Sequence, residues 1–356
     1  MTPVFPRGVL VVGAGLLGTS LGLALRREGV AVHLRDRNPD TVAAAVARGA
    51  GSASPTPSQV DLAVVAVPPA ATGRTVAAVL DEGVAAYVTD VASVKVLPAR
   101  EVAARTATAA RYVGGHPMAG REVSGPGAAA VDLFRGRPWV VCPSEGSDPA
   151  ATGLVRALAV AVGAQPVTMP AGEHDAAVAL VSHAPHLVAS LVAARLEDAP
   201  EREVGLAGQG VVDVTRVAAG DPLLWTEILE ANAAAVRAVL TGVRADLDAA
   251  LAALDEAGGG ALTGLLEAGV RGRNRLPGKH GGRPTTYVTV PVTVEDRPGQ
   301  LAKLFADAGA AGVNVEDVRI EHVQGIPTGV VEIAVRPGRD EDLARALRSC
   351  GWTVHR

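Results

Sequence analysis

The sequence is poor in aromatic side chains: only 3% of its 356 residues are Phe, Trp or Tyr. Ala, Val, Leu and Gly dominate instead, so its cores must be packed from small aliphatic side chains, and its Ala-rich segments favour helices. A chain of this length exceeds one typical core. We therefore expect a globular protein of two or three domains.

Cysteine is scarce, and no long basic run is present. Cys142 and Cys350 lie far apart, which argues against a disulfide scaffold and indicates a reduced, cytoplasmic protein. The formal net charge of −4 offers no electrostatic footprint for nucleic acid. The apolar run Val9–Val12 is too short for a membrane span or a signal peptide. We expect a cytoplasmic protein that binds neither nucleic acid nor a membrane.

The first part of the chain has the pattern of an α/β domain. Residues 8–36 read as a strand, a Gly-rich turn, an Ala/Leu-rich helix and a second strand that ends at Asp36. Further apolar runs alternate with Ala-rich helical segments, the runs being Leu62–Val67, Ala85–Val88, Tyr112–Gly114 and Trp139–Cys142, and the helices including Thr72–Leu80 and Val96–Ala104. This order predicts a doubly wound Rossmann domain over residues 1–170.

The remaining chain divides into a helical part and a second α/β part. Residues 171–270 predict an all-α domain, with helices at His174–Leu196, Glu201–Ala219 and Pro222–Leu251. The Gly- and Arg-rich stretch Ala257–Arg283 indicates an exposed linker or loop, although part of Leu262–Ala268 could be helical, and we assign the linker to residues 271–285. Residues 286–356 have the pattern βαββαβ, which predicts a ferredoxin-like α+β domain. The expected strands are Tyr287–Val294, Val313–His322, Gly329–Val335 and Trp352–His355, and the expected helices are Gly299–Ala310 and Asp340–Cys350.

A dinucleotide site is predicted at the first turn. Gly13, Gly15 and Gly18 form G-x-G-x-x-G between a strand and a helix, where Leu16 and Leu17 open the helix. Pyrophosphate is expected on the free backbone N–H groups there. Asp36 is placed to accept hydrogen bonds from ribose hydroxyls, and its carboxylate favours NAD over NADP because it repels a 2′-phosphate.

Polar residues concentrate in three later segments, which are Thr89–Lys95, Gly114–Gly120 and Ser182–His186. The first two follow predicted parallel strands, so Ser93 and His116 are expected near the nicotinamide, in the crevice beyond the carboxyl ends of the strands. Two other readings are open here: Ser93 could cap the helix that begins near Lys95, and Asp175 could be a helix-start acid without a chemical task. His183 and His186 lack the companion ligands of a metal site, so none is predicted.

Taken with the run from Asp213 through Arg216 to Trp225, these segments resemble the prephenate dehydrogenase family over residues 8–250. The resemblance implies a Rossmann domain followed by a helical dimerisation domain, and hence a homodimer. It implies that His116 is catalytic with Ser93 as its hydrogen-bonding partner, and that the substrate pocket includes Arg216, Ser182, His183, His186 and Trp225. One departure is Gln209, at a position where many relatives continue a glycine run, which leaves the fine substrate preference open but not the reaction class.

The implied reaction is the NAD-dependent oxidative decarboxylation of prephenate to 4-hydroxyphenylpyruvate in tyrosine biosynthesis. A neutral imidazole at His116 suits the acceptance of the 4-hydroxyl proton. Arg216 suits bidentate binding of a substrate carboxylate. The absence of lysine between Lys95 and Lys279 argues against the β-hydroxyacid-type dehydrogenases, which use a lysine base, and favours a site that works through imidazole and guanidinium groups.

The C-terminal segment resembles the ACT domain family, whose members bind amino acids. The resemblance lies in Val292–Phe305 and in Gly312–Val315. It implies an effector site at Asp296, Pro298, Gly299, Gln300 and Asn314, with tyrosine as the expected effector. Arogenate dehydrogenase and a non-catalytic sensor of NAD and amino acids stay open as alternatives, and the sequence alone does not decide between prephenate and arogenate.

Overall fold

The computed structural model describes residues 4–5, 7–53, 59–121, 123–255, 259–276, 286–322 and 327–355. The chain separates by internal contacts into two units, residues 1–245 and residues 246–356, and each is described by itself.

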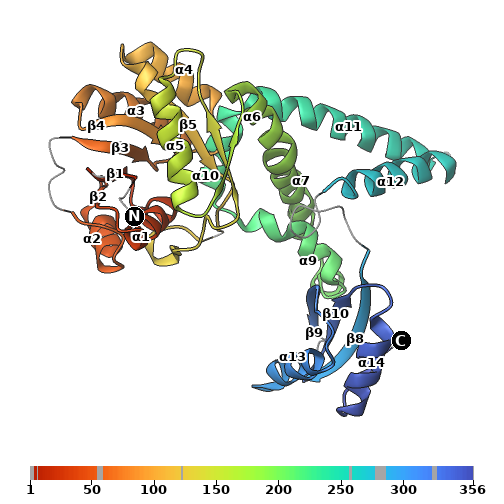
Figure 1. Cartoon of the computed structure of the whole chain (residues 1–356). Helices are drawn as coiled ribbons and strands as arrows, with labels where there is room; N and C mark the ends of the chain where they lie inside the picture. Colours follow the sequence, from red (N-terminus) through yellow and green to blue (C-terminus); the bar gives the residue numbers. More distant parts are fainter. Residues whose placement is uncertain are drawn as a thin grey trace. The chain divides into compact units, whose positions relative to one another are not determined.

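Within its described residues the first unit contains a seven-stranded sheet in the order β2-β1-β3-β4-β5-β6-β7 (Figure 1). Every neighbouring pair is parallel except β5 and β6. The strands are β1 (Val9–Val12), β2 (Val32–Arg35), β3 (Val60–Val65), β4 (Ala85–Asp90), β5 (Tyr112–Pro117), β6 (Pro138–Cys142) and β7 (Gln165–Thr168). The predicted doubly wound sheet is confirmed, and β7 is an additional edge strand.

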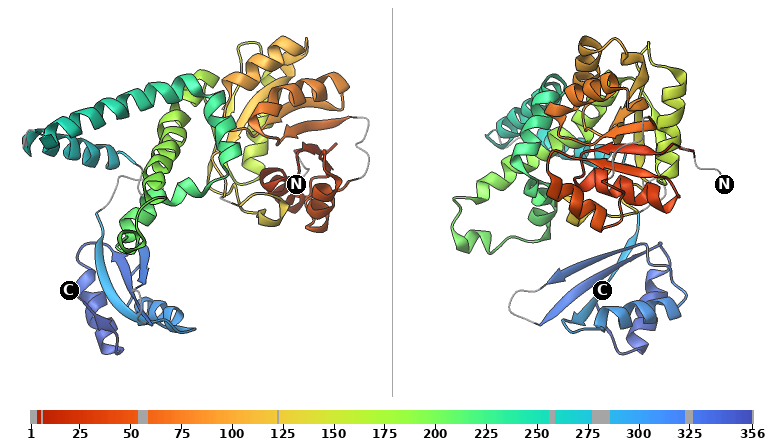
Figure 2. Two further views of the ribbon diagram at one scale, coloured as in Figure 1. Left: turned by 180° about the vertical axis from the view of Figure 1, so that it is seen from behind. Right: turned by 90° about the vertical axis from the view of Figure 1, so that its left-hand side faces the viewer.

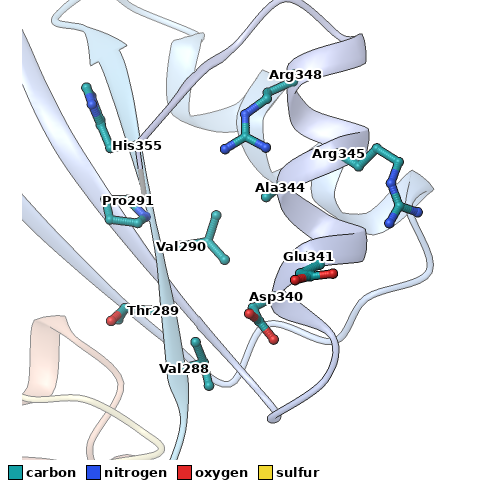
Figure 3. A pocket seen from close by; sticks show the side chains of 10 residues that line it. All are labelled: Val288, Thr289, Val290, Pro291, Asp340, Glu341, Ala344, Arg345, Arg348 and His355. Carbon is teal, nitrogen blue, oxygen red and sulfur yellow. The ribbon is translucent and has the colours of Figure 1, made fainter.

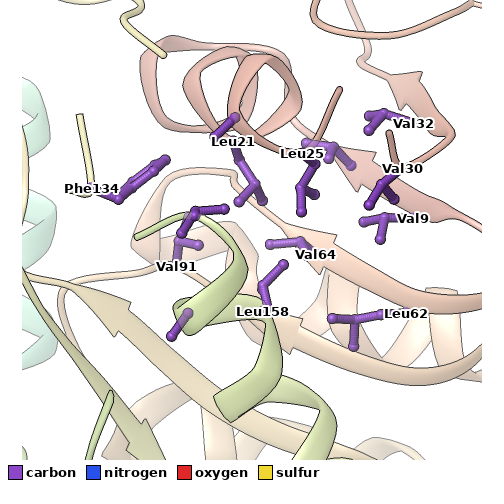
Figure 4. Packing of buried hydrophobic residues seen from close by; sticks show 14 of the residues in the cluster. Val9, Leu21, Leu25, Val30, Val32, Leu62, Val64, Val91, Phe134 and Leu158 are labelled. Carbon is purple, nitrogen blue, oxygen red and sulfur yellow. The ribbon is translucent and has the colours of Figure 1, made fainter. Parts of the chain in front are cut away.

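Helices cover both faces of this sheet because its central strands are apolar on both sides. Val9 and Val11 of β1 join one core cluster, whereas Leu10 and Val12 join the other. Figure 4 shows the first cluster, in which Leu21, Leu25 and Leu158 pack on the sheet. The helices on this face are α1 (Leu16–Arg27), α2 (Pro39–Ala47) and α5 (Pro149–Ala161), and those on the other face are α3 (Pro69–Glu82) and α4 (Val96–Arg105).

The helical segment that follows is more broken than predicted. Its described helices are α6 (Ala171–Val178), α7 (Ala184–Ala193), α8 (Glu201–Val204), α9 (Gln209–Thr215), α10 (Pro222–Ala231) and α11 (Ala233–Asp255). A π-helical turn, Ala179–His183, joins α6 to α7. Pro185 follows this turn and has no N–H to donate to the preceding turn, which explains the irregularity. The predicted helix Glu201–Ala219 is wrong as one element, because glycine-containing turns at Gly205 and Gly208 interrupt it.

The second unit contains the βαββαβ order predicted from the sequence (Figure 2). Its elements are β8 (Val288–Glu295), α13 (Gln300–Ala310), β9 (Asp317–His322), β10 (Thr328–Val335), α14 (Asp340–Ser349) and β11 (Thr353–Val354), preceded by α12 (Gly259–Arg273). The antiparallel sheet has the order β11-β8-β10-β9. Leu304 of α13 and Leu343 of α14 share one core cluster with alternate residues of β8, so both helices cover the same face.

Within the expected linker, the sequence analysis allowed a helix at Leu262–Ala268. Helix α12 includes this stretch and extends beyond it at both ends. From residue 277 onward the expected linker lies outside the described residues.

Candidate active site

A pocket of about 680 Å³ lies at the carboxyl end of β1. Gly13 has a φ of +103°, and a Cβ there would lie 2.2 Å from the carbonyl oxygen of Ala66, so a side chain is sterically excluded. A Cβ on Gly15 would instead point into open space. Gly15 precedes α1 without a side-chain cap, which leaves the N–H groups at the start of α1, where Leu16 and Leu17 lie, without a side-chain partner. These features fit a bound pyrophosphate.

Asp36 closes the same pocket from the end of β2. Its carboxylate accepts hydrogen bonds from the backbone N–H groups of Ala14 at 2.8 Å and Asn38 at 2.9 Å. The acid therefore lies against the glycine turn, where the sequence places the ribose of a dinucleotide. Arg37 and Arg74 also line this pocket.

His116 is carried by β5, the strand on which the polar Gly114–Gly120 segment begins. Its Nδ1 lies 2.8 Å from Nε2 of His174, and the two rings meet edge to face with their centroids 5.0 Å apart. Nδ1 of His174 in turn lies 2.8 Å from Oδ1 of Asp175. His116, His174 and Asp175 thus form a continuous chain, which we call the imidazole relay.

Asp175 also joins α6 to the start of α4. Its two carboxylate oxygens accept the backbone N–H groups of Lys95 at 2.8 Å and of Val96 at 2.9 Å. Burial acts to raise the pKa of Asp175, but the hydrogen bonds from His174, Val96 and Lys95 outweigh it and lower the pKa below its ordinary value. Asp175 therefore has a structural task, because its carboxylate caps α4 rather than its own helix.

Lys95 is a site residue that the sequence analysis missed. Its side chain is 1% exposed, and its ammonium pairs with the carboxylate of Asp90 and donates to the carbonyl oxygen of Gly115 at 2.7 Å. Tyr112 donates its hydroxyl to the other Asp90 oxygen at 2.6 Å. The buried ammonium therefore anchors the residue immediately before His116, so the site does not consist of imidazole and guanidinium groups alone. A lysine between two valines, Val94 and Val96, was the available sequence signal.

The electrostatic surroundings keep His116 neutral. Burial is the main cause, and the neighbouring His174, Lys95 and His183 add to it, so the pKa of His116 lies well below its usual value. A neutral imidazole is the form that can accept a proton.

Ser93 does not make the predicted hydrogen bond to His116, whose Nδ1 atom is bonded to His174 instead. Nor does Ser93 cap α4, whose first N–H groups are taken by Asp175. The Ser93 hydroxyl is buried without a hydrogen-bond partner in the protein. A buried hydroxyl in this position needs a partner, which a bound ligand can supply.

The predicted substrate residues gather along α7 and α10. His186 stacks on Trp225 with the ring centroids 3.5 Å apart, and His183 meets the same indole edge to face at 6.3 Å. Burial lowers the pKa of His183 to about 4 and also lowers that of His186. A Cβ on Gly220 would lie 2.4 Å from Nε1 of Trp225, so this glycine allows the stack to form.

The other predicted substrate residues are more accessible, and one further contact was missed. Ser182 is half-buried in the π-helical turn, and Arg216 is exposed at the start of the turn Arg216–Ala219, which packs against α7. Asn232, between α10 and α11, donates to the backbone oxygen of Asp175 at 2.8 Å and lies 3.1 Å from Nδ1 of His183. No local sequence pattern marks Asn232.

The predicted effector residues lie on two turns of the second unit. Asp296, Pro298 and Gly299 belong to the turn between β8 and α13, and Gly299 has a φ of +88° at the start of that helix. The amide of Asn314 donates to Glu316 at 2.9 Å.

None of these effector residues lines the groove of about 510 Å³ between β8 and α14. That groove has an apolar floor at Val290 and Pro291, with Arg348 and His355 toward one end and Asp340 toward the other (Figure 3). In the part of the chain that the structure describes, no group of three potential ligands is arranged for a metal ion.

A dinucleotide pocket on a doubly wound sheet, with a neutral histidine at the carboxyl end of β5 that is bonded to the following helical segment, defines a nicotinamide-dependent dehydrogenase. The chain belongs to the prephenate dehydrogenase family. Residues 21–168 match the family profile described as prephenate dehydrogenase, nucleotide-binding domain, and residues 170–267 match that of the dimerization domain.

Full-length relatives agree with this assignment. The chain is 40% identical to the probable prephenate dehydrogenase NovF of Streptomyces niveus, over 98% of this chain and 99% of the relative. It is 25% identical to the prephenate dehydrogenase of Bacillus subtilis, over 95% and 94% of the two chains.

Among solved structures, it is similar to prephenate dehydrogenase from Aquifex aeolicus in complex with hydroxyphenyl propionate and NAD+ (TM-score 0.67, 27% identity, 75% of this chain and 96% of that chain). It is also similar to Synechocystis arogenate dehydrogenase (TM-score 0.64, 27% identity, 75% and 99%).

Proposed function

We propose that this protein is an NAD-dependent prephenate dehydrogenase. Prephenate loses a hydride from C4 and carbon dioxide from C1, and the ring becomes the phenol of 4-hydroxyphenylpyruvate. The observation that carries the proposal is the neutral His116, held on β5 by the imidazole relay. Membership of the family and the names of the full-length relatives support the same reaction.

The chain's own residues prepare the substrate for this chemistry. His116 accepts the proton of the 4-hydroxyl as the C4–O bond gains carbonyl character, and the proton returns to this oxygen when loss of carbon dioxide makes the ring aromatic. Ser93, with its unpartnered hydroxyl, orients the reacting groups from the loop after β4. Arg216 binds a substrate carboxylate in a bidentate contact, and the stack of His186 on Trp225, with His183 and Ser182, lines the ring pocket.

The cofactor is NAD, which when bound accepts the hydride. Gly13 and Gly15, with the start of α1 at Leu16 and Leu17, would hold the pyrophosphate, and Asp36 would accept hydrogen bonds from the ribose. Gly18 lets α1 pack closely against the turn, because a Cβ there would lie 1.8 Å from the carbonyl oxygen of Gly13. The open space in front of Gly15 and the pocket volume are consistent with this ligand.

The enzyme acts as a homodimer in the cytoplasm. The apolar run Ala171–Leu196 is long enough to span a bilayer by length and composition, but it carries His174 and Asp175, which bond to β5 and α4. On this run Leu180, Val181 and Leu191 are each about 60% exposed in a single chain. A second copy covers these side chains, which agrees with the family profile's dimerization domain. The partner copy then lies close to the substrate pocket.

The second unit is an ACT domain that binds tyrosine and regulates turnover. Its βαββαβ order and the positive φ of Gly299 at the start of α13 support a site for an amino-acid carboxylate at Asp296, Pro298, Gly299, Gln300 and Asn314. Titration of the full-length enzyme with tyrosine tests this role. Binding heat with altered turnover is the expected result, and the absence of both contradicts it.

The proposed reaction is tested by offering prephenate and arogenate separately, each with NAD and with NADP, to the purified protein. Reduction of NAD with prephenate is the expected result. Reduction with arogenate alone would keep the mechanism and change the substrate. No reduction with any of the four pairs would contradict catalysis and favour the alternative of a non-catalytic sensor of NAD and amino acids.

A further inference from the structure

The imidazole relay links the helical segment to the reacting end of the sheet through two hydrogen bonds. One bond joins Asp175 Oδ1 to Nδ1 of His174, and the other joins Nε2 of His174 to Nδ1 of His116, each at 2.8 Å. His174 is fully buried and lies between the other two groups. Both ring nitrogen atoms of His174 therefore have hydrogen-bond partners within the protein.

The carboxylate of Asp175 determines which atom donates in each of the two hydrogen bonds. The carboxylate of Asp175 is ionised, because its pKa is lowered, and an ionised carboxylate only accepts hydrogen bonds. Nδ1 of His174 must then carry the proton, and in a neutral ring Nε2 is left with a lone pair. A lone pair at Nε2 can bond to Nδ1 of His116 only if that atom is protonated.

We infer that His174 and Asp175 are positioning residues that hold His116 in the tautomer with its proton on Nδ1, so that Nε2 is the proton acceptor for the substrate. Neither residue touches the substrate in this role. The inference rests on the proposed dehydrogenase reaction for its kinetic consequence, but the tautomer itself is a property of the free protein.

Both ends of the relay are anchored, which makes it suited to positioning. Asp175 is held by the backbone N–H groups of Lys95 and Val96, and its own backbone oxygen accepts from Asn232. At the other end, the ammonium of Lys95 holds the carbonyl oxygen of Gly115. The same contacts that pack α6 against the sheet therefore also orient the imidazole of His116.

The test compares His174→Gln with His174→Leu in the full-length enzyme. A glutamine can accept from His116 through Oε1 and donate to Asp175 through Nε2, so it preserves the direction of both bonds. We expect His174→Gln to retain most of the turnover, whereas His174→Leu lowers kcat about 10- to 100-fold, part of the 10²–10⁴ that a placed base contributes. KM for NAD should change little in both. His355→Leu, on the second unit, is the matched control and should retain normal kcat.

A spectroscopic measurement makes the test independent of turnover. Long-range ¹H–¹⁵N correlation spectra of histidine-labelled protein distinguish the two tautomers, and the signal of His116 is identified by its loss in His116→Asn. The expected spectrum shows the proton on Nδ1 of His116 in the wild type and in His174→Gln, and a changed tautomer population in His174→Leu. A proton on Nε2 of His116 in the wild type, or normal kcat in His174→Leu, would overturn the inference. Absence of turnover in the wild type would instead refute the proposed function and leave the tautomer measurable.

Discussion

The ammonium of Lys95 donates a hydrogen bond to the carbonyl oxygen of Gly115 at 2.7 Å, and so ties the loop after β4 to the residue that precedes His116. The same ammonium neutralises Asp90, which is fully buried. The side chain of Lys95 therefore both neutralises the buried charge of Asp90 and helps to position His116.

Replacement of this lysine should be costly. Lys95→Met removes the cation and leaves the carboxylate of Asp90 buried with only neutral donors, a loss that costs about 3–5 kcal/mol in comparable buried pairs. Chemical denaturation monitored by circular dichroism measures the free energy of unfolding. Lys303→Met is the control, because Lys303 is exposed over the ring of Trp352, and it should lose less than about 1 kcal/mol. Equal losses in the two variants would contradict the assigned role of Lys95.

His116→Asn should keep substrate binding and lose turnover by about 10²–10⁴-fold, because the amide cannot accept the 4-hydroxyl proton as the imidazole does. Steady-state rates give kcat, and equilibrium binding of the product 4-hydroxyphenylpyruvate reports the intact pocket. Turnover near that of the wild type would refute the role of His116 as the base.

Asp36→Ser should relax the choice of cofactor. The carboxylate that repels a 2′-phosphate is removed, while Arg37 and Arg74 already line the same pocket and can receive a phosphate. We expect the ratio of kcat/KM with NAD to that with NADP to fall by at least about tenfold, since one lost repulsion is worth more than about 1.4 kcal/mol at close range. Asp40→Ser, in the exposed first turn of α2, is the control and should leave the ratio unchanged. An unchanged ratio in Asp36→Ser would show that Asp36 does not select the cofactor.

Gly220→Ala should damage the substrate pocket selectively. The new Cβ would lie 2.4 Å from Nε1 of Trp225 and 3.1 Å from Cε1 of His186, so the stacked pair must shift. We expect a raised KM for prephenate with an unchanged KM for NAD. Gly242→Ala in α11, where a Cβ meets nothing within 4 Å, should leave both constants as they are. A normal KM for prephenate in Gly220→Ala would show that the stacked pair His186 and Trp225 does not belong to the substrate pocket.

Stability should fall on acidification through His183. The pKa of His183 is about 4 in the folded protein, below its ordinary value of 6.5, so the unfolded chain binds more protons between these values. The contribution of His183 to the free energy of unfolding is therefore fully present above pH 6.5 and is lost as the pH falls from 6.5 toward 4. Thermal melts across this window should show a smaller loss for His183→Gln than for the wild type. An identical pH dependence in the two proteins would contradict the buried, neutral state of His183.

The sequence predicts the parts of this protein that depend on local pattern. The glycine turn and Asp36 directly follow strands, and His116 lies near the end of β5, so strand order alone brings them to the carboxyl end of the sheet. The six elements from β8 to β11 follow the predicted order and lie within a few residues of their predicted bounds.

The relay could not be predicted, because its bonds join segments that are distant in sequence. His174 and Asp175 look like ordinary residues at the start of a helix, and only the packing of α6 on β5 and α4 gives them partners. The burial of Lys95 could not be predicted either, because Gly115 and Asp175, which bond to it, lie 20 and 80 residues away in the sequence.

The most direct test of the account measures reduced NAD and released carbon dioxide together while the purified wild-type protein consumes prephenate. The account predicts equal amounts of the two products, with one 4-hydroxyphenylpyruvate formed for each. Reduction of NAD without carbon dioxide release, or no reduction at all, would contradict it.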